Sequence, residues 1–208
     1  QKICKRGVPE AVTQLTTPVT ALCYNLMLAN LIGDIGVSTF SVLSFIYSLA
    51  NAILSGVAQG LQPLWGYCYG RQDTEELGWY FRRGIIINSM LSIFIYGILF
   101  VFDTSVICIF NRDADLVRTA SDALPLFSLS FIPMAINLIY TAFLFSTKRT
   151  GAADIIAISR GIVVKAMAIL GIPMLFGVNA IWIAPLVAEL ITLVLAIWLG
   201  KTTRLVYR

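Results

Sequence analysis

Three ionisable side chains interrupt long apolar runs in the second half of the chain: Arg160, Lys165 and Glu189. At 1.5 Å per helical residue, Arg160 and Lys165 lie about 14 and 21 Å into a run that begins near residue 151. Glu189 lies about 16 Å into the following run, which begins near residue 178. If these runs cross a membrane as neighbours, Lys165 and Glu189 can meet near mid-depth. Charges at that depth cost several kcal/mol unless they are paired or hydrated, so this network predicts either a polar pathway or a structural ion pair.

Uncharged polar residues also recur at helical spacing along three apolar runs, and at 100° per residue each set falls on one face. The sets are Glu10, Gln14, Thr17, Pro18, Ala21 and Asn25; Ser44, Ser48, Asn51, Ser55, Ala58 and Gln62; and Ser130, Pro133, Asn137 and Thr141. They predict a partly wet interior. The candidates for lining it are Gln14, Thr17, Asn25, Asn51, Ser55, Asn137 and Thr141. Hydrogen bonding between packed helices is the alternative explanation, because Ser, Thr, Asn and Gln also serve that purpose in membranes.

The segment 56–70, with the sequence GVAQGLQPLWGYCYG, ends an apolar run with polar residues, glycines and aromatics before charges resume at Arg71. Polar groups inside a bilayer need partners, because each uncompensated group costs on the order of a few kcal/mol. The position at a helix end favours a packing and gating role over contact with a ligand. The residues assigned to that role are Gln59, Gly60, Gln62, Pro63, Gly66, Tyr67 and Gly70. Gly56 and Gly60 form a GxxxG pair, which predicts close helix packing.

The composition assigns the chain to the membrane proteins. Hydrophobic residues make up 58% and charged residues 12% of the 208 residues, and the mean hydropathy is +0.84. A soluble protein of this composition could not cover its core with polar surface. A span needs roughly 20 apolar residues, so the length predicts an all-α polytopic bundle of six transmembrane helices in a single lobe. The expected spans are 9–32, 37–64, 79–102, 119–146, 151–176 and 178–199.

Basic residues predict the orientation of these spans. Those at the two termini and in the second and fourth loops are Lys2, Lys5, Arg6, Arg71, Arg82, Arg83, Lys148, Arg149, Lys201, Arg204 and Arg208. Only Arg112 and Arg118 fall in the opposite loops. Both termini are therefore expected in the cytoplasm. Basic flanks also account for the net charge of +4, so no nucleic-acid partner is expected.

Glycines and charges mark the expected loops at 33–36, 70–78, 111–113 and 177–179. Prolines at 18, 125, 133, 173 and 185 fall inside expected spans and should bend them. The four cysteines, with no CxxC pair, predict neither a disulfide framework nor a zinc site. The first residues lack both an initiator methionine and a signal-peptide pattern, which suggests a fragment of a longer protein.

Taken together, these motifs resemble one half of a multidrug and toxic compound extrusion (MATE) transporter, over essentially the whole chain. The most specific match is AQGLQPLWGYCYG at 58–70. It is supported by Gly7-Val8-Pro9, by Ser159-Arg160-Gly161, and by Trp182 with the run from Pro185 to Glu189. Their order is similar to that of the carboxyl-terminal six-helix lobe.

The resemblance implies a 12-helix antiporter of two lobes in the cell membrane, which exports amphipathic, often cationic drugs or toxic metabolites by alternating access. The partners would be these small molecules, membrane lipid and the missing amino-terminal lobe. No cofactor or metal is expected, because an ion gradient supplies the free energy. In the sodium-coupled branch this lobe carries acids in its first and fourth spans, but Thr17 and a position near Met134 stand there. Protons are therefore favoured over sodium as the coupling ion.

Three other functions are less consistent with the sequence. A flippase for lipid-linked oligosaccharide would use a similar lobe but needs a more basic interior for a pyrophosphate, and only Arg160 and Lys165 are available. An intramembrane enzyme would need a nucleophile or metal motif, yet the chain has no histidine, no GxSxG and no paired intramembrane aspartates. A purely structural membrane subunit is the third alternative.

Overall fold

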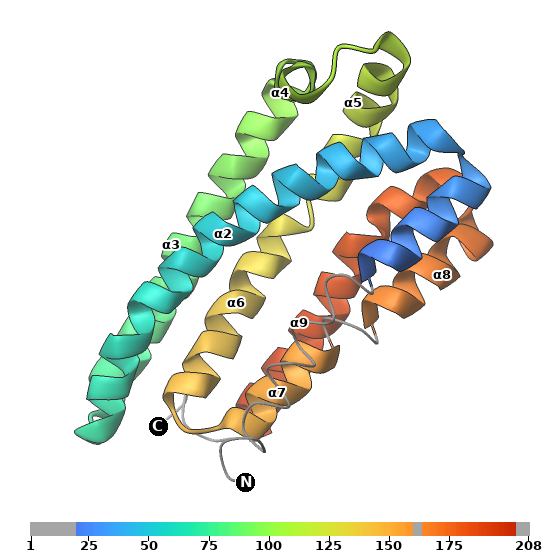
Figure 1. Cartoon of the computed structure of the whole chain (residues 1–208). Coiled ribbons are helices and arrows are strands. Elements are labelled where there is room, and N and C mark those ends of the chain that lie inside the picture. Colours follow the sequence, from blue (N-terminus) through green and yellow to red (C-terminus); the bar gives the residue numbers. More distant parts are fainter. Residues whose placement is uncertain (1–19, 160–163, 203–208) are drawn as a thin grey trace, which may run out of the picture.

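The computed structural model describes residues 20–159 and 164–202, and in these ranges every regular element is a helix. A helix over 20–31 precedes the labelled elements. The others are α2 (Asp34–Gly70), α3 (Thr74–Val101), α4 (Asp103–Phe110), α5 (Ala114–Ser128), α6 (Phe131–Ser146), α7 (Thr150–Ile158), α8 (Val164–Phe176), the 3-10 helix η2 (Val178–Ile183) and α9 (Ala184–Thr202). α2, α3 and α6 pack side by side, and α9 packs against α6, α7 and α8 (Figure 1).

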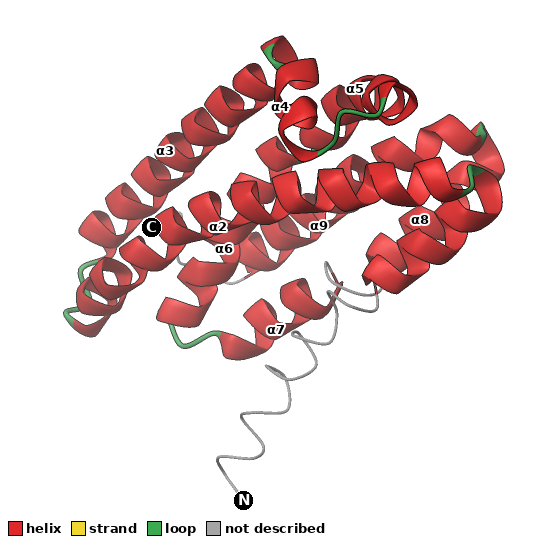
Figure 2. Ribbon diagram, turned by 45° about the horizontal axis from the view of Figure 1, so that its top comes forward, coloured by secondary structure: helices red, strands yellow, loops and turns green. Residues whose placement is uncertain are grey.

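The helices α2 and α3 are longer than the sequence predicted, and the loop between them is only 71–73 instead of 70–78 (Figure 2). α3 begins at Thr74 rather than 79 because Asp73 caps it, its carboxylate accepting the backbone N–H of Glu76 at 3.0 Å. α2 continues past the expected end at 64 because Trp65 and Cys68 extend its buried face. The expected break at 33–36 is likewise shorter, since Gly36 already belongs to α2.

The expected span 119–146 is two helices, α5 and α6, which meet at 129–130 with a bend of 42°. The bend follows from Pro133, because a proline cannot donate to the carbonyl four residues earlier, that of Leu129. Hydroxyls satisfy neighbouring carbonyls at the break: Ser128 Oγ donates to Leu124 O at 2.7 Å and Ser130 Oγ to Phe127 O at 2.7 Å. Pro133 thus bends its span as predicted, whereas Pro125 and Pro173 lie within continuous helices.

The structure subdivides the other expected spans in ways that the sequence did not predict. The short helix α4 was not predicted, and α5 begins at Ala114 because Asp113 accepts the N–H groups of Asp115 and Leu116. Gly177 follows α8, and its φ of 88° does not allow the helix to continue. The expected span 178–199 therefore begins with the 3-10 helix η2. The expected span 151–176 comprises α7 and α8, and 160–163 between them lie outside the described residues, as does the first part of span 9–32.

Three of the described helices are long and apolar enough to cross a membrane: Asp34–Gly70, Thr74–Val101 and Val178–Trp198. The bent pair of α5 and α6 makes a fourth candidate, and α8 is a shorter apolar helix. Six spans remain a prediction for the whole chain.

The main core lies where helix 20–31, α2, α5, α6, η2 and α9 meet. A second cluster holds α3 against α2 and α6 around Trp65, whose ring packs edge-on to Phe143 with centroids 5.6 Å apart. Phe81 from α3 belongs to the same cluster, and its ring centroid lies 4.5 Å from that of Phe143. These contacts fix α6 between α2 and α9, and thereby fix the position of the polar residues on its inner face.

The close glycine contact occurs at Gly84, whereas Gly56 and Gly60 were expected to provide it. A Cβ added at Gly84 would lie 2.7 Å from Leu61 Cδ1 and 3.4 Å from Trp65 Cζ2, so α3 approaches α2 closely there. Gly56 and Gly60 are exposed, and a Cβ at either would meet nothing within 4 Å. The predicted GxxxG packing is therefore wrong for the contacts among the described residues.

Gly84→Leu should destabilise the protein by about 1–3 kcal/mol, because the added side chain overpacks the contact of α3 with Leu61 and Trp65. Gly97→Leu is the matched control, since Gly97 lies on the same helix and has open space around it. The apparent midpoint of thermal unfolding in detergent measures both. Equal midpoints for the two variants would show that α2 and α3 are not in close contact at Gly84.

Candidate functional site

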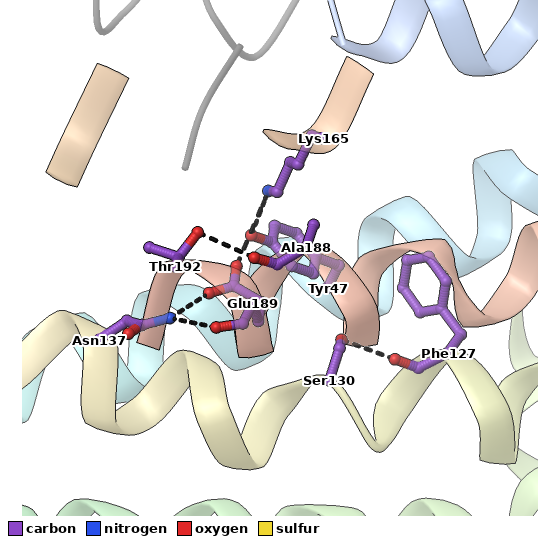
Figure 3. Close-up of polar contacts among 8 residues, drawn as sticks. All are labelled: Tyr47, Phe127, Ser130, Asn137, Lys165, Ala188, Glu189 and Thr192. Atoms are coloured by element: carbon purple, nitrogen blue, oxygen red, sulfur yellow. Dashed lines mark hydrogen bonds and ion pairs between the residues drawn. The ribbon is translucent and has the colours of Figure 1, made fainter. Parts of the chain in front are cut away.

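The charged residues of α8 and α9 meet beside two polar residues of α2 and α6 (Figure 3). Lys165 Nζ lies 4.0 Å from Glu189 Oε1 and donates a hydrogen bond of 3.1 Å to Tyr47 Oη. Asn137 Nδ2 donates to Glu189 Oε2 at 2.8 Å and to the Glu189 backbone oxygen at 2.9 Å. We call these four residues, Tyr47, Asn137, Lys165 and Glu189, the Glu189 cluster.

The two charges of the cluster differ in burial. The Glu189 side chain is 1% exposed and that of Lys165 is 18% exposed. A carboxylate so deeply buried loses most of its hydration, which costs several kcal/mol unless hydrogen bonds and an opposite charge compensate it. The amide of Asn137 supplies one such hydrogen bond, and the ammonium of Lys165 supplies an opposite charge. Lys165 is the more accessible of the pair.

Local structure places each member of the cluster. Asn137 lies on α6 two turns after the break at 129–130, and Thr141 Oγ1 donates to its backbone oxygen at 2.8 Å. On α9, Thr192 Oγ1 makes the same type of bond to Ala188 O at 2.8 Å, so this hydroxyl is used within its own helix. The ring of Tyr47 packs near Phe127 and Phe131, with centroids 6.2 and 6.0 Å apart. Four helices therefore hold the cluster.

The other predicted cavity-lining residues are spread over the lobe. Gln14, Thr17 and, from the charge network, Arg160 lie outside the described residues. Asn25, Asn51, Ser55 and Thr141 are half-buried, and Asn137 is buried. Of the candidates within the described residues, the structure brings only Asn137 into contact with the charged pair.

Most of the family-motif residues in the segment 56–70 lie on the outer surface of the lobe. The exposed ones are Gln59, Gly60, Pro63, Gly66, Tyr67 and Gly70, while Gln62 is half-buried. Arg71 follows them, and its Nη1 donates to Tyr67 Oη at 3.3 Å. The inward face consists of Ala58, Trp65 and Cys68. Apart from Gln62, the family-motif residues are therefore not packed inside the lobe, and their gating role remains a prediction.

Two polar contacts in the structure were not predicted from the sequence. Tyr47 was absent from the predicted stripes although it is a hydroxyl-bearing residue in an apolar run, which is the one signal that could have identified it. Asn88 on α3 donates to Ala135 O at 2.8 Å and fastens α3 to α6. Asn88 could have been identified in the same way, because it is a polar residue in the middle of the expected apolar span 79–102. Among the described residues, no group of His, Cys, Asp or Glu side chains could hold a metal ion.

An all-helical bundle with helices long and apolar enough to cross a membrane, and with a buried carboxylate beside an ammonium, defines a polytopic membrane protein of the kind that includes secondary transporters. The family model described as MatE matches residues 9–170. The chain belongs to the MATE family, whose members are transporters rather than enzymes.

Curated relatives agree with this assignment. The chain is 27% identical over 183 residues to the multidrug export protein MepA of Staphylococcus saprophyticus, covering 87% of this chain and 38% of that protein. It is 25% identical over 207 residues to MepA of Staphylococcus haemolyticus, covering 98% of this chain and 44% of that protein. The chain thus spans less than half the length of these relatives.

Solved structures show the same fold. An outward-facing multidrug resistance MATE family transporter of the MOP superfamily matches with a TM-score of 0.87 and 17% identity, covering 95% of this chain and 45% of that one. A MOP superfamily transporter from Pyrococcus furiosus Vc1 matches with a TM-score of 0.86, 18% identity and the same coverage. The protein is therefore about half of a MATE transporter fold.

Proposed function

We propose that this chain is the carboxyl-terminal six-helix lobe of a secondary antiporter that exports amphipathic, cationic drugs or toxic metabolites by alternating access. Its partner is the amino-terminal lobe of the same transporter, and both termini of the chain face the cytoplasm of a cell whose plasma membrane holds the protein. The names of the MepA relatives support multidrug export as the activity. The order of the motifs along the chain supports the carboxyl-terminal lobe.

The observation that carries this proposal is a contrast between the outer faces of α2 and α3. The exposed side chains in the middle of α3 are all apolar: Ile86, Ile87, Met90, Ile93, Phe94 and Ile98. On α2, beside the exposed apolar Phe45, Leu49 and Ile53, a polar stripe is also exposed or half-buried, and it consists of Ser44, Ser48, Asn51, Ser55, Gln59 and Gln62. A surface of isoleucine, methionine and phenylalanine suits lipid, whereas a polar stripe of this length requires water or a protein partner.

The polar stripe of α2 is thus the side of the lobe that faces the cavity between two lobes. Asn51 and Ser55, both half-buried, lie at the centre of this stripe and are the proposed lining residues. Gln59, Gly60 and Pro63 continue along the same helix toward the charged loop. They are placed to contact the second lobe when the cavity closes on that side.

In the full-length protein, Ser48→Cys should react roughly tenfold faster with a membrane-impermeant maleimide than Met90→Cys, because thiol modification requires a hydrated thiolate. Ser48 belongs to the polar stripe, and Met90 lies on the apolar face of α3 with 66% of its surface exposed in the isolated lobe. The native cysteines are first replaced by serine, and labelling is followed by mass spectrometry. Faster labelling at position 90 would contradict the assignment of the two faces.

Protons are the proposed coupling ion. The sodium-coupled pattern of acids is absent at Thr17 and near Met134, a residue that is fully buried in the apolar core. A carboxylate at that position would carry an uncompensated charge among hydrophobic side chains. The acid that drives exchange is accordingly assigned to the amino-terminal lobe.

Everted membrane vesicles that contain the full-length protein test the proposed export. Ethidium should accumulate inside them when a proton gradient is imposed and should leave when the gradient is collapsed. Vesicles without the protein are the control. Absence of accumulation under both a proton gradient and a sodium gradient would refute the antiporter function.

A further inference from the structure

The outward face of α3 changes its chemistry along the helix. α3 lies at the edge of the bundle, where it packs against α2, α5 and α6 (Figure 1). From Gly84 to Val101 it carries no charged residue, and at 1.5 Å per residue this stretch measures about 27 Å, close to the thickness of a bilayer core. Its exposed side chains are isoleucine, methionine, phenylalanine and valine. The acyl chains of lipids are therefore the expected neighbours of this part of α3.

Two arginines lie on the same face directly before the apolar stretch. Arg82 and Arg83 are exposed, and among the residues whose side chains are described no carboxylate lies within 4.0 Å of either guanidinium. The Arg83 guanidinium lies over the ring of Trp79, 5.2 Å from its centroid, which holds it close to the helix. At the edge of a bilayer core, guanidinium groups without a carboxylate partner meet the phosphates of lipid headgroups, which they bind through their fork of N–H donors.

A hollow of about 500 Å³ lies at the start of α3, next to the loop 71–73. Its lining consists of Asp73, Glu75, Glu76, Trp79 and Tyr80. Asp73 caps α3, and the Cys68 thiol donates to Glu76 at 3.6 Å. Glu75 has no hydrogen-bond or ion-pair partner among the described side chains. Because tryptophan and tyrosine are typical of the membrane–water interface, this hollow offers carboxylates to a positive group at the level of the headgroups.

The two charged sets share one side of the helix. At 100° per residue, Glu75, Glu76, Arg82 and Arg83 fall within an arc of about 120°. Each glutamate is seven residues from an arginine, about 10 Å along the axis, so a group that bridges them must carry both charges. From the membrane to the loop, this side presents apolar side chains, positive charges, aromatic rings and negative charges. A phospholipid with a terminal ammonium has the complementary order of acyl chains, phosphate and ammonium.

We propose that this face of α3 binds phosphatidylethanolamine. The phosphate lies on Arg82 and Arg83, the ammonium lies in the hollow at Glu75 and Glu76, and the acyl chains follow the apolar face from Ile86 onward. The ammonium donates N–H groups to the carboxylates, which the quaternary ammonium of phosphatidylcholine cannot do and for which phosphatidylglycerol has no charge. A lipid held in this way fixes the depth of α2 and α3 in the leaflet on the side of the loop 71–73. The inference depends neither on export nor on the assignment of the lobe.

A different explanation for the arginines is that they only set the orientation of the span, as basic residues beside spans do. That role requires positive charge but no particular lipid. It predicts equal association with phospholipids of different headgroups, and it gives no function to the carboxylates of the hollow. The choice of lipid at this face therefore separates the two explanations.

Quenching of a tryptophan by brominated lipids measures which lipid occupies the face. The reporter is Ile86→Trp, at a side chain that is 50% exposed and follows the arginines on the same side of α3. The full-length protein is reconstituted in digalactosyl diacylglycerol, a host lipid that has neither phosphate nor charge. A small fraction of dibrominated phosphatidylethanolamine, phosphatidylcholine or phosphatidylglycerol is added. The reporter signal is the difference between proteins with and without Ile86→Trp.

Phosphatidylethanolamine should associate about threefold more strongly than phosphatidylcholine or phosphatidylglycerol, as expected for an exposed ion pair. Glu75→Gln/Glu76→Gln should remove this preference and leave the association of phosphatidylcholine unchanged. Arg82→Gln/Arg83→Gln should weaken the association of all three lipids about fivefold, because they share the phosphate. Arg112→Gln, at an exposed arginine in the loop before α5, is the control and should have no effect.

Equal association of the three lipids with the reporter protein would overturn the proposal. A preference for phosphatidylethanolamine that persists in Glu75→Gln/Glu76→Gln would overturn it as well, because the carboxylates would then have no part in the choice. Stronger association of phosphatidylglycerol than of phosphatidylethanolamine would show that the arginines alone select the lipid, which also contradicts the proposed site.

Discussion

Glu189→Ala should lower the free energy of unfolding of the full-length protein by about 3–5 kcal/mol, since removing one partner of a buried ion pair leaves the other uncompensated. Asn137 also loses one of its two acceptors, the carboxylate, in this variant. Lys165→Ala should cost at least as much as Glu189→Ala, because the carboxylate that it leaves without this ammonium is 1% exposed, whereas Glu189→Ala leaves an ammonium that is 18% exposed. The double variant should be at least about 1 kcal/mol more stable than the sum of the single effects.

Thermal or steric-trap unfolding in detergent measures this double-mutant cycle. Asp122→Ala is the control, because Asp122 is an exposed acid on α5 and its removal should leave stability nearly unchanged. Strictly additive effects of Lys165→Ala and Glu189→Ala would show that the two charges do not interact in the folded protein.

Asn137→Leu should cost about 3 kcal/mol, because a hydrogen bond to a charged group contributes about 1.5–3 kcal/mol and a second bond, to a main-chain oxygen, is lost as well. Asn137→Asp should be more damaging than Asn137→Leu, although it is nearly isosteric with asparagine. It places a second carboxylate 2.8 Å from Glu189 Oε2, where the amide nitrogen now donates.

Asn88→Leu is the reference variant for this comparison, because Asn88 makes one hydrogen bond to a neutral carbonyl. Loss of this bond should lower the free energy of unfolding by about 1–2 kcal/mol. The apparent unfolding midpoints of the three variants give the comparison. A smaller loss in Asn137→Asp than in Asn137→Leu would contradict the donor role of the Asn137 amide toward Glu189.

The class of protein and much of its helical organisation followed from the sequence, because hydropathy and turn residues are local properties. The ends of the helices did not follow. Asp73 and Asp113 act as caps that lengthen α3 and α5, and Pro133 divides one expected span into α5 and α6. A cap depends on the φ and ψ angles of one residue, which hydropathy does not specify.

The candidate site was predicted only in part for a related reason. The depth of Lys165 and Glu189 along their helices could be counted, and the structure brings them together. Their contacts with Tyr47 and Asn137 depend on how α2 and α6 are rotated against α8 and α9, which no local pattern gives. The prediction for the glycines was wrong for the same reason: spacing alone could not show that Gly84 faces another helix and that Gly56 and Gly60 face outward.

Exchange in proteoliposomes tests the central claim, that this chain is half of a proton-coupled exporter of organic cations. The full-length protein is reconstituted with a pH-sensitive dye trapped inside, and tetraphenylphosphonium transport and proton flux are recorded together. We predict opposite fluxes of the two species, driven by an imposed pH gradient and unaffected when sodium is replaced by potassium. Transport that requires sodium, or tetraphenylphosphonium flux without proton movement, would contradict this account.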